Sequence, residues 1–175
     1  MSIKSKIRAI PDYPIPGIMF RDITTLLKDT EGFKDTIDIL VERYGNTDIS
    51  KVAGIESRGF ILGAPLAYLL GVGFVPIRKK GKLPADTVGI DYELEYGTDR
   101  LEIHTDSVGS GEKVLLVDDL IATGGTAVAA AKLIEISKGN VSGFIFVINL
   151  FDLPGSNLLK KKGYKIESLI EFPGH

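Results

Sequence analysis

Residues 114–126 read Val114-Leu115-Leu116-Val117-Asp118-Asp119-Leu120-Ile121-Ala122-Thr123-Gly124-Gly125-Thr126. The apolar run at the start predicts a buried strand, Lys113 to Val117, and the residues from about Gly125 to Ser137 are expected to form a helix. A strand that ends in two acids and leads through a loop of small residues into a helix is typical of open α/β sheets. Ligands bind at the carboxyl ends of the strands in such sheets. The stretch therefore predicts both a fold class and a ligand site.

The loop Ala122 to Thr126 has the properties of a phosphate site. Its consecutive backbone N–H groups lie at a predicted helix N-terminus, where the partial positive charge favours an anion. The two threonine hydroxyls add hydrogen-bond donors. Asp118 and Asp119 cannot hold the phosphate themselves, because like charges repel. They suit the hydroxyl groups of a sugar, or a Mg²⁺ ion held through water. The alternative is a surface turn in which the acids only cap a helix.

In the rest of the chain, short apolar runs typical of strands alternate with stretches of helical periodicity. This alternation predicts a parallel-sheet core flanked by helices. Further helices are expected at about 31–44, at 60–70 and after Pro154, with strands at 52–55, 73–78, 143–150 and 164–170. Residues 86–95 and 100–104 alternate around a turn at 96–99, which predicts an antiparallel hairpin. Three prolines between Ile10 and Asp22 predict an extended, irregular flap at the edge of the fold.

Composition excludes several classes of protein. The 175 residues predict a single domain, residues 1–175, and 44% hydrophobic with 25% charged residues is typical of globular chains. The absence of cysteine excludes disulfides and thiolate metal sites. Two histidines are too few for a histidine cage, and a net charge of −2 indicates no nucleic-acid partner.

An uncharged run raises the question of a membrane span. It covers nineteen residues from Gly59 to Ile77. Pro65 interrupts it, and a helix of residues 60–70 would be only about 16 Å long, half of a bilayer core. A buried helix followed by a strand is therefore predicted, with no membrane partner. The first residues lack the apolar segment of a signal peptide, so a cytoplasmic location is expected.

The run of apolar residues, two acids and Thr-Gly-Gly-Thr resembles the signature of the type I phosphoribosyltransferases. This resemblance implies a site for 5-phosphoribosyl 1-pyrophosphate (PRPP), with Ala122, Thr123, Gly124, Gly125 and Thr126 on the 5-phosphate and the acid pair on the ribose. It also places pyrophosphate at the loop Gly54 to Gly59, which contains Ser57 and Arg58. Beyond that loop it implies a mobile lid of about residues 79–100, with Lys79 and Lys82 as pyrophosphate partners. Taken alone, Arg58 is read as a surface residue, but beside the first phosphate site its guanidinium becomes a candidate partner for a second phosphate. The basic run 78–82 is equally consistent with a solvated face.

The flap, Pro11 to Ile23, together with the other motifs in order, is similar to one branch of that family, the adenine phosphoribosyltransferases. The resemblance implies that Phe20 and Leu120 enclose the base and that the main chain of Met19 and Arg21 reads it. A backbone carbonyl accepts from the amine of adenine and repels the carbonyl oxygen of hypoxanthine or guanine. Taken alone, Phe20 could equally be a core residue.

The activity implied is transfer of the phosphoribosyl group from PRPP to adenine, giving AMP and pyrophosphate in purine salvage. Glu95, Arg58 and Tyr96 are the expected catalytic residues, with Glu95 managing the purine's proton and Tyr96 closing over the site. Glu95 could instead be a solvent-facing strand residue. Mg²⁺ is expected mainly on PRPP, near Asp118 and Asp119, and a homodimer is implied. Two alternatives stay open: a hypoxanthine or guanine phosphoribosyltransferase, and a non-catalytic regulator that senses PRPP.

Overall fold

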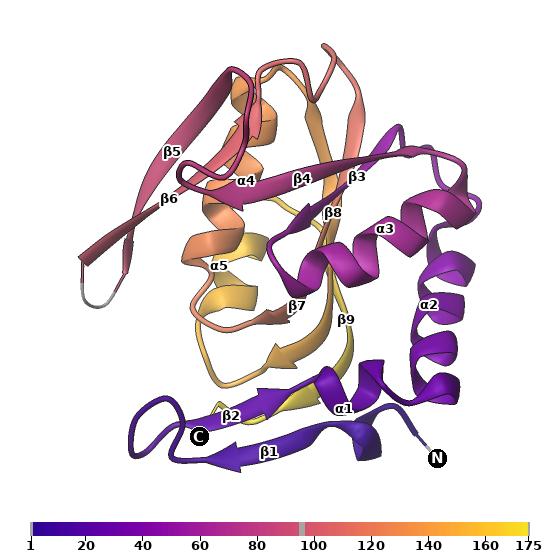
Figure 1. Cartoon of the computed structure of the whole chain (residues 1–175), viewed down its shortest axis with the longest axis vertical. Helices are drawn as coiled ribbons and strands as arrows, with labels where there is room; N and C mark the ends of the chain where they lie inside the picture. Colours follow the sequence, from indigo (N-terminus) through magenta and orange to yellow (C-terminus); the bar gives the residue numbers. More distant parts are fainter. Residues whose placement is uncertain (1, 95–96, 175) are drawn as a thin grey trace.

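The computed structural model describes residues 2–94 and 97–174. Within that part, the chain forms a seven-stranded sheet with strand order β5-β6-β4-β3-β7-β8-β9 (Figure 1). The strands are β3 (Lys51–Ile55), β4 (Gly73–Lys79), β5 (Thr87–Leu94), β6 (Gly97–His104), β7 (Lys113–Ile121), β8 (Asn140–Leu150) and β9 (Ile166–Phe172). Strands β4, β3, β7, β8 and β9 are parallel, which confirms the predicted core. The predicted hairpin, β5 and β6, extends this sheet because β6 pairs antiparallel with β4.

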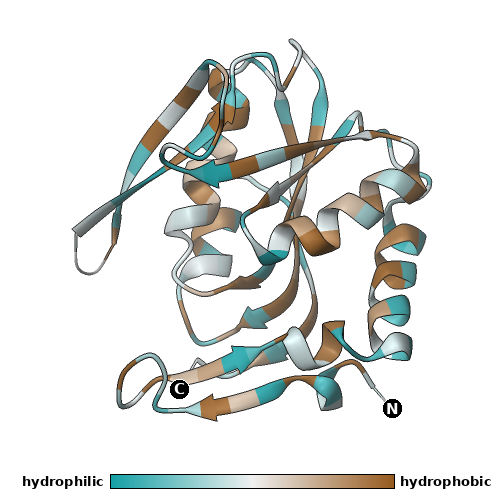
Figure 2. Cartoon of the chain, viewed as in Figure 1, coloured by the Kyte–Doolittle hydropathy of each residue, from teal (hydrophilic) through white to brown (hydrophobic). Residues whose placement is uncertain are grey.

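Helices cover both faces of the sheet. Helices α2 (Thr30–Tyr44) and α3 (Arg58–Leu70), with the short α1 (Thr24–Leu27), pack on one face, and α4 (Gly125–Ile136) and α5 (Gly155–Lys161) pack on the other. A short 3-10 helix, Lys4–Lys6, precedes them. Figure 2 shows hydrophobic residues along the central strands, and α2 alternating between hydrophobic and hydrophilic residues along its length. This pattern gives two buried cores with the sheet between them.

Local signals explain where the helices begin and end. Asp29 caps α2 by accepting a hydrogen bond of 2.7 Å from the N–H of Gly32. Helix α3 ends at Gly71, which adopts the left-handed conformation with φ of 73°. Pro65 lies inside α3 without ending it. None of the helices in the described chain is long and apolar enough to cross a membrane.

The N-terminal flap is more regular than predicted. Strands β1 (Arg8–Pro11) and β2 (Met19–Asp22) form a separate two-stranded antiparallel sheet. The expectation of an irregular path was wrong, because Pro14 and Pro16 fall in the connection between the strands. The side chain of Asp22 fixes the base of this hairpin by accepting hydrogen bonds from Arg8 and Thr24.

Two strand boundaries also differ from the prediction. β7 continues past Val117 to Ile121, because Asp118 and Leu120 pair with Phe146 and Ile148 of β8. The acid pair therefore belongs to the strand itself. In the hairpin, residues 98 and 99 were expected in the turn, but they lie in β6 opposite Glu93 and Tyr92.

Candidate active site

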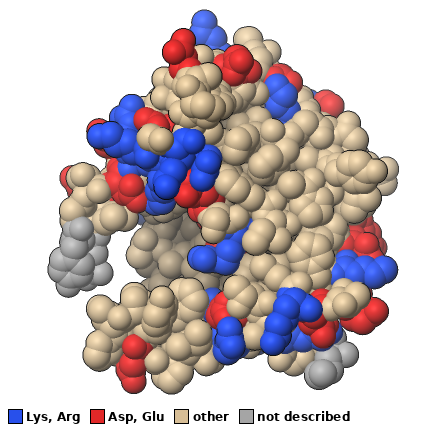
Figure 3. All heavy atoms as spheres, in the orientation of Figure 1, with Lys and Arg blue, Asp and Glu red and all other residues tan. Residues whose placement is uncertain are grey.

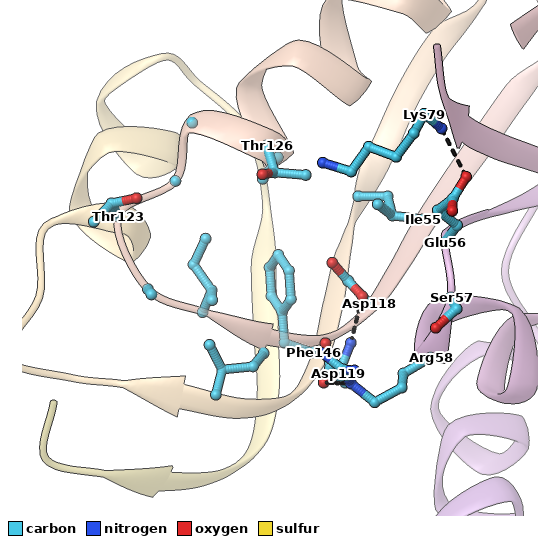
Figure 4. Close-up of a pocket in the computed structure, with 16 residues that line it drawn as sticks. Ile55, Glu56, Ser57, Arg58, Lys79, Asp118, Asp119, Thr123, Thr126 and Phe146 are labelled. Atoms are coloured by element: carbon cyan, nitrogen blue, oxygen red, sulfur yellow. Dashed lines mark hydrogen bonds and ion pairs between the residues drawn. The ribbon is translucent and has the colours of Figure 1, made fainter. Parts of the chain in front are cut away.

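A cavity of about 270 Å³ lies at the carboxyl ends of β3 and β7, beside the N-termini of α3 and α4 (Figure 4). It brings together most of the predicted site residues: Ser57, Arg58, Lys79, Asp118, Asp119, Leu120 and Ala122, Thr123, Gly124, Gly125, Thr126. Figure 3 shows that this face of the molecule is hollowed between the two hairpins, with Lys and Arg side chains gathered on the β4 side.

Other predicted residues do not line the cavity. Met19, Phe20 and Arg21 lie on β2 of the flap, and Lys82 is an exposed residue after β4. The predicted catalytic residues Glu95 and Tyr96 lie outside the described residues.

The two acids have different surroundings because neighbouring residues of a strand point to opposite faces. Asp118 points into the cavity, whereas Asp119 points toward Arg58, whose Nε donates to it over 2.5 Å (Figure 4). Burial raises the pKa of Asp118 well above its usual range, and the neighbouring Asp119 raises it further. A carboxyl group in this state favours a partner that donates hydrogen bonds or carries positive charge. Sugar hydroxyls or a cation would meet that requirement.

The phosphate loop between β7 and α4 is built entirely of small residues. Gly124 precedes α4 with φ of 93° and has no side chain to cap the helix. The helix N-terminus is thus open to an anion from the cavity. The loop is supported from behind by α5, because the N–H of Gly155 donates to the carbonyl oxygen of Ala122 over 2.9 Å. Sequence reasoning missed this support, since nothing near Pro154 indicates which loop it packs against.

The second loop joins β3 to α3 through Glu56, Ser57 and Arg58. The Glu56–Ser57 peptide bond is cis. Glu56, which the sequence did not single out, accepts hydrogen bonds from the backbone N–H of Lys79 over 2.7 Å and from Nε of Arg78 over 3.3 Å. It therefore ties the end of β4 to this loop. The sequence did carry a signal for this contact. Glu56 directly follows a buried strand, and Arg78 lies at the matching end of the next strand.

The predicted pyrophosphate residue Lys79 is held by the β5–β6 hairpin. Its ammonium group donates to the hydroxyl of Tyr92 over 2.8 Å and to the carboxylate of Asp99. Burial acts to lower the pKa of Lys79, but the bonds to Asp99 and Tyr92 outweigh it and raise the pKa. The ammonium thus stays charged at the wall of the cavity.

The flap lies near the same site. Phe20 contacts Tyr13 edge to face, with 5.1 Å between the ring centroids. Asp22, on the same face of β2 as Phe20, is close enough to Arg58 to help raise the pKa of that guanidinium. Burial opposes this rise, and the bond to Asp119 is its main cause. Asp22 therefore lies near the Arg58 side of the cavity, and its side chain is hydrogen-bonded to Arg8 and Thr24.

Comparison with known proteins agrees with this geometry. Residues 22–172 match the phosphoribosyl transferase domain family. The adenine phosphoribosyltransferase of Methylobacillus flagellatus is 63% identical over 172 residues, which are 98% of each chain.

Solved structures show the same likeness. The crystal structure of the enzyme of that name from Thermoanaerobacter pseudethanolicus is 54% identical, with a TM-score of 0.92 over 97% of this chain and 98% of that one. A Saccharomyces cerevisiae adenine phosphoribosyltransferase, crystallised with adenine and an imino-altritol bisphosphate, is 38% identical, with a TM-score of 0.88 over 96% of both chains. The chain therefore belongs to the adenine phosphoribosyltransferases, enzymes of purine salvage that make AMP and pyrophosphate from adenine and PRPP.

Proposed function

We propose that the cavity binds PRPP across two loops and that the N-terminal flap delivers adenine to it. One observation carries this proposal: a single cavity joins two strand-to-helix loops, at residues 55–58 and 121–127, with Asp118 between them. A ligand with a phosphate at each end and a sugar in the middle matches that order. The matched relatives favour adenine over hypoxanthine or guanine, and an enzyme over a PRPP-sensing regulator.

The phosphate loop, Ala122 to Thr126, is proposed to hold the 5-phosphate at the N-terminus of α4. Asp118 and Asp119 are proposed to accept hydrogen bonds from the ribose hydroxyls. Support comes from their placement near the carboxyl end of β7, where both acids line the cavity together with Leu120. Arg58 holds Asp119 in place from the other side. The ribose would therefore be held through its 5-phosphate at one end, through its pyrophosphate at the other, and through its hydroxyl groups by the acid pair.

Pyrophosphate is proposed to lie at the loop of Ser57 and Arg58, with Lys79 and, after lid closure, Lys82 as further partners. Mg²⁺ fits this donor set because carboxylates and phosphate oxygens are the hard ligands it prefers. Among residues 2–94 and 97–174, no group of three or more His, Cys, Asp or Glu side chains could hold a metal alone. The ion is proposed to be held chiefly by PRPP oxygens, near Asp118 and Asp119. When bound, it neutralises charge on the departing pyrophosphate.

The reaction then needs positioning more than covalent chemistry. N9 of adenine forms a bond to C1 of the ribose while the bond from C1 to pyrophosphate breaks, and the electron pair leaves with pyrophosphate. Residues of the two loops hold the reacting atoms in line and stabilise the charge that develops. Phe20 and Leu120 are proposed to enclose the base, with the carbonyl of Met19 and the N–H of Arg21 reading its edge. The proton of N9 is assigned to Glu95, by the resemblance alone.

The remaining expectations stay predictions. The chain is proposed to act as one domain in which the flap, about 10–23, selects the base and the lid, about 79–100, excludes water under Tyr96. A homodimer is proposed because α3 exposes an apolar face with Ile61, Tyr68 and Leu69. Sedimentation at micromolar concentration tests it, and a monomer there would contradict it. A cytoplasmic location is proposed from the sequence analysis alone.

Kinetics with separate bases test the function. Pyrophosphate release is followed with PRPP, Mg²⁺ and one base at a time, and release is expected with adenine. Asp119→Ala should raise KM for PRPP, whereas Glu95→Ala should mainly lower kcat. Asp48→Ala is the matched control, because Asp48 is exposed and pairs with Lys113 far from the cavity. Unchanged rates in both site variants would refute the assignment of the site.

A further inference from the structure

The ring of Phe172, at the end of β9, lies beneath the side chain of Arg21 from the flap. The guanidinium carbon of Arg21 is 4.3 Å from the ring centroid, and the ammonium of Lys4 is 4.9 Å from it. Nε of Arg21 is buried and has no hydrogen-bond partner in the described chain. The face of the aromatic ring is thus a favourable contact for a guanidinium whose Nε is buried without a hydrogen bond.

The backbone of Phe172 is held in place by hydrogen bonds of the main sheet. It pairs with Leu150 in the parallel ladder between β8 and β9, and its carbonyl oxygen accepts from the N–H of Phe151 over 3.1 Å. Two residues later, the N–H of Gly174 donates to Asp152 over 2.5 Å. The backbone on both sides of the ring is therefore tied to the loop after β8.

The flap has few such anchors. Within the described residues, β2 pairs only with β1, and a two-stranded sheet is marginally stable without other contacts. Phe20 and Asp22 lie on one face of β2, so Arg21 extends from the opposite face. Its contact with Phe172 joins that opposite face to β9. This contact holds the strand end of the flap against β9, in addition to the bonds of Asp22 at the base of the hairpin.

We propose that Phe172 is a positioning residue for adenine recognition, acting through Arg21. The proposal rests on the function proposed above for the flap, in which the main chain of Met19 and Arg21 reads the base. Hydrogen bonds to a flat base weaken steeply when the donor or acceptor shifts. A flap that lost its support on β9 would therefore hold adenine less well and leave the PRPP loops unchanged.

The test is the division of effects between the two substrates. Phe172→Leu keeps an apolar side chain and removes the aromatic face. It should raise KM for adenine about threefold to thirtyfold, the range of a partly to fully desolvated cation–π contact, and leave KM for PRPP within about twofold. Phe172→Tyr keeps the aromatic face, so its KM for adenine should equal that of the unmodified protein. Phe151→Leu is the control, since this ring is 53% exposed and follows β8 at the same edge.

A double variant shows whether the effect passes through Arg21. Arg21→Leu removes the guanidinium and keeps the main-chain N–H, so adding Phe172→Leu to it should raise the KM for adenine no further. Independent effects of the two changes would overturn the proposal. So would an equal rise in both KM values together with a lower Tm, which a purely structural role predicts.

Phe20→Ala separates this proposal from the one on which it rests. If Phe20→Ala raises the KM for adenine and Phe172→Leu does not, Phe172 has no positioning role. If neither variant changes it, the flap does not bind the base, and both proposals fail.

Discussion

Gly155→Ala should misplace the phosphate loop without touching any ligand. A Cβ built on Gly155 would lie 2.5 Å from the carbonyl oxygen of Ala122 and 2.9 Å from the backbone nitrogen of Gly124. Ordinary contact begins at 3.4 Å, so the loop must retreat by about 0.9 Å. These two atoms belong to the backbone, so rotation of the third clashing group, the Ile121 side chain at 2.9 Å, cannot relieve the clash.

The magnitude follows from that displacement. A shift of about 1 Å in groups that position a substrate can lower the rate by about a hundredfold. We expect KM for PRPP to rise about tenfold to a hundredfold. The binding of ribose 5-phosphate should weaken in parallel, because both ligands carry the 5-phosphate, whereas pyrophosphate binding should stay unchanged. Overpacking of this kind costs about 1–3 kcal/mol of stability, so Tm should also fall by several degrees.

Steady-state kinetics and calorimetric titration measure these effects. Gly73→Ala is the matched control, since a Cβ there meets no atom closer than 3.9 Å. It should change neither Tm nor KM for PRPP. A Gly155→Ala enzyme with the expected loss of Tm but an unaltered KM for PRPP would refute the reasoning. It would show that the loop does not take its position from α5.

Three further predictions concern charges. Asp118→Asn should raise Tm of the ligand-free protein at pH 7 while raising KM for PRPP. The raised pKa of Asp118 means that its ionised form destabilises the fold, so the gain should grow as pH rises through that pKa; a constant gain would contradict this. Tyr92→Phe removes one bond to Lys79 and should weaken pyrophosphate binding about fivefold and not ribose 5-phosphate binding, in calorimetric titrations. The pKa of Asp22 is about 2, because bonds from Thr24 and Arg8 outweigh burial. Asp22→Asn should therefore lower Tm at pH 7. The stabilisation by ionised Asp22 is lost as pH falls from 3.8 toward 2, so a difference as large at pH 2 as at pH 7 would contradict this cause.

The sequence predicted those parts of the site that follow from local backbone chemistry. The strand of residues 114–117, the acid pair and the loop from Ala122 to Thr126 are contiguous, and their order predicts a strand end that opens into a helix. The structure confirms that the acid pair and the loop line one cavity with Arg58. Contiguity works here because the proposed phosphate site consists of backbone groups of a single turn.

Contacts between distant segments could not be read in the same way. Glu56 acts on the end of β4, Gly155 supports the loop of Ala122, and Asp99 with Tyr92 holds Lys79. Each pair is separated by more than ten residues. No periodicity or spacing indicates such a contact, because it depends on how strands and helices pack.

The amino-acid sequence was enough to predict the fold class, the two loops proposed to bind phosphate and the acids between them, since each is a local pattern in one strand and the turn that follows. Tertiary structure was needed to show that Asp118 points into the cavity and Asp119 toward Arg58, because that depends on β7 continuing to Ile121 in register with β8. It also decided that the flap forms a hairpin supported on Phe172. Neither fact is local: a side chain's direction and its support are set by neighbours that the fold brings from elsewhere in the chain.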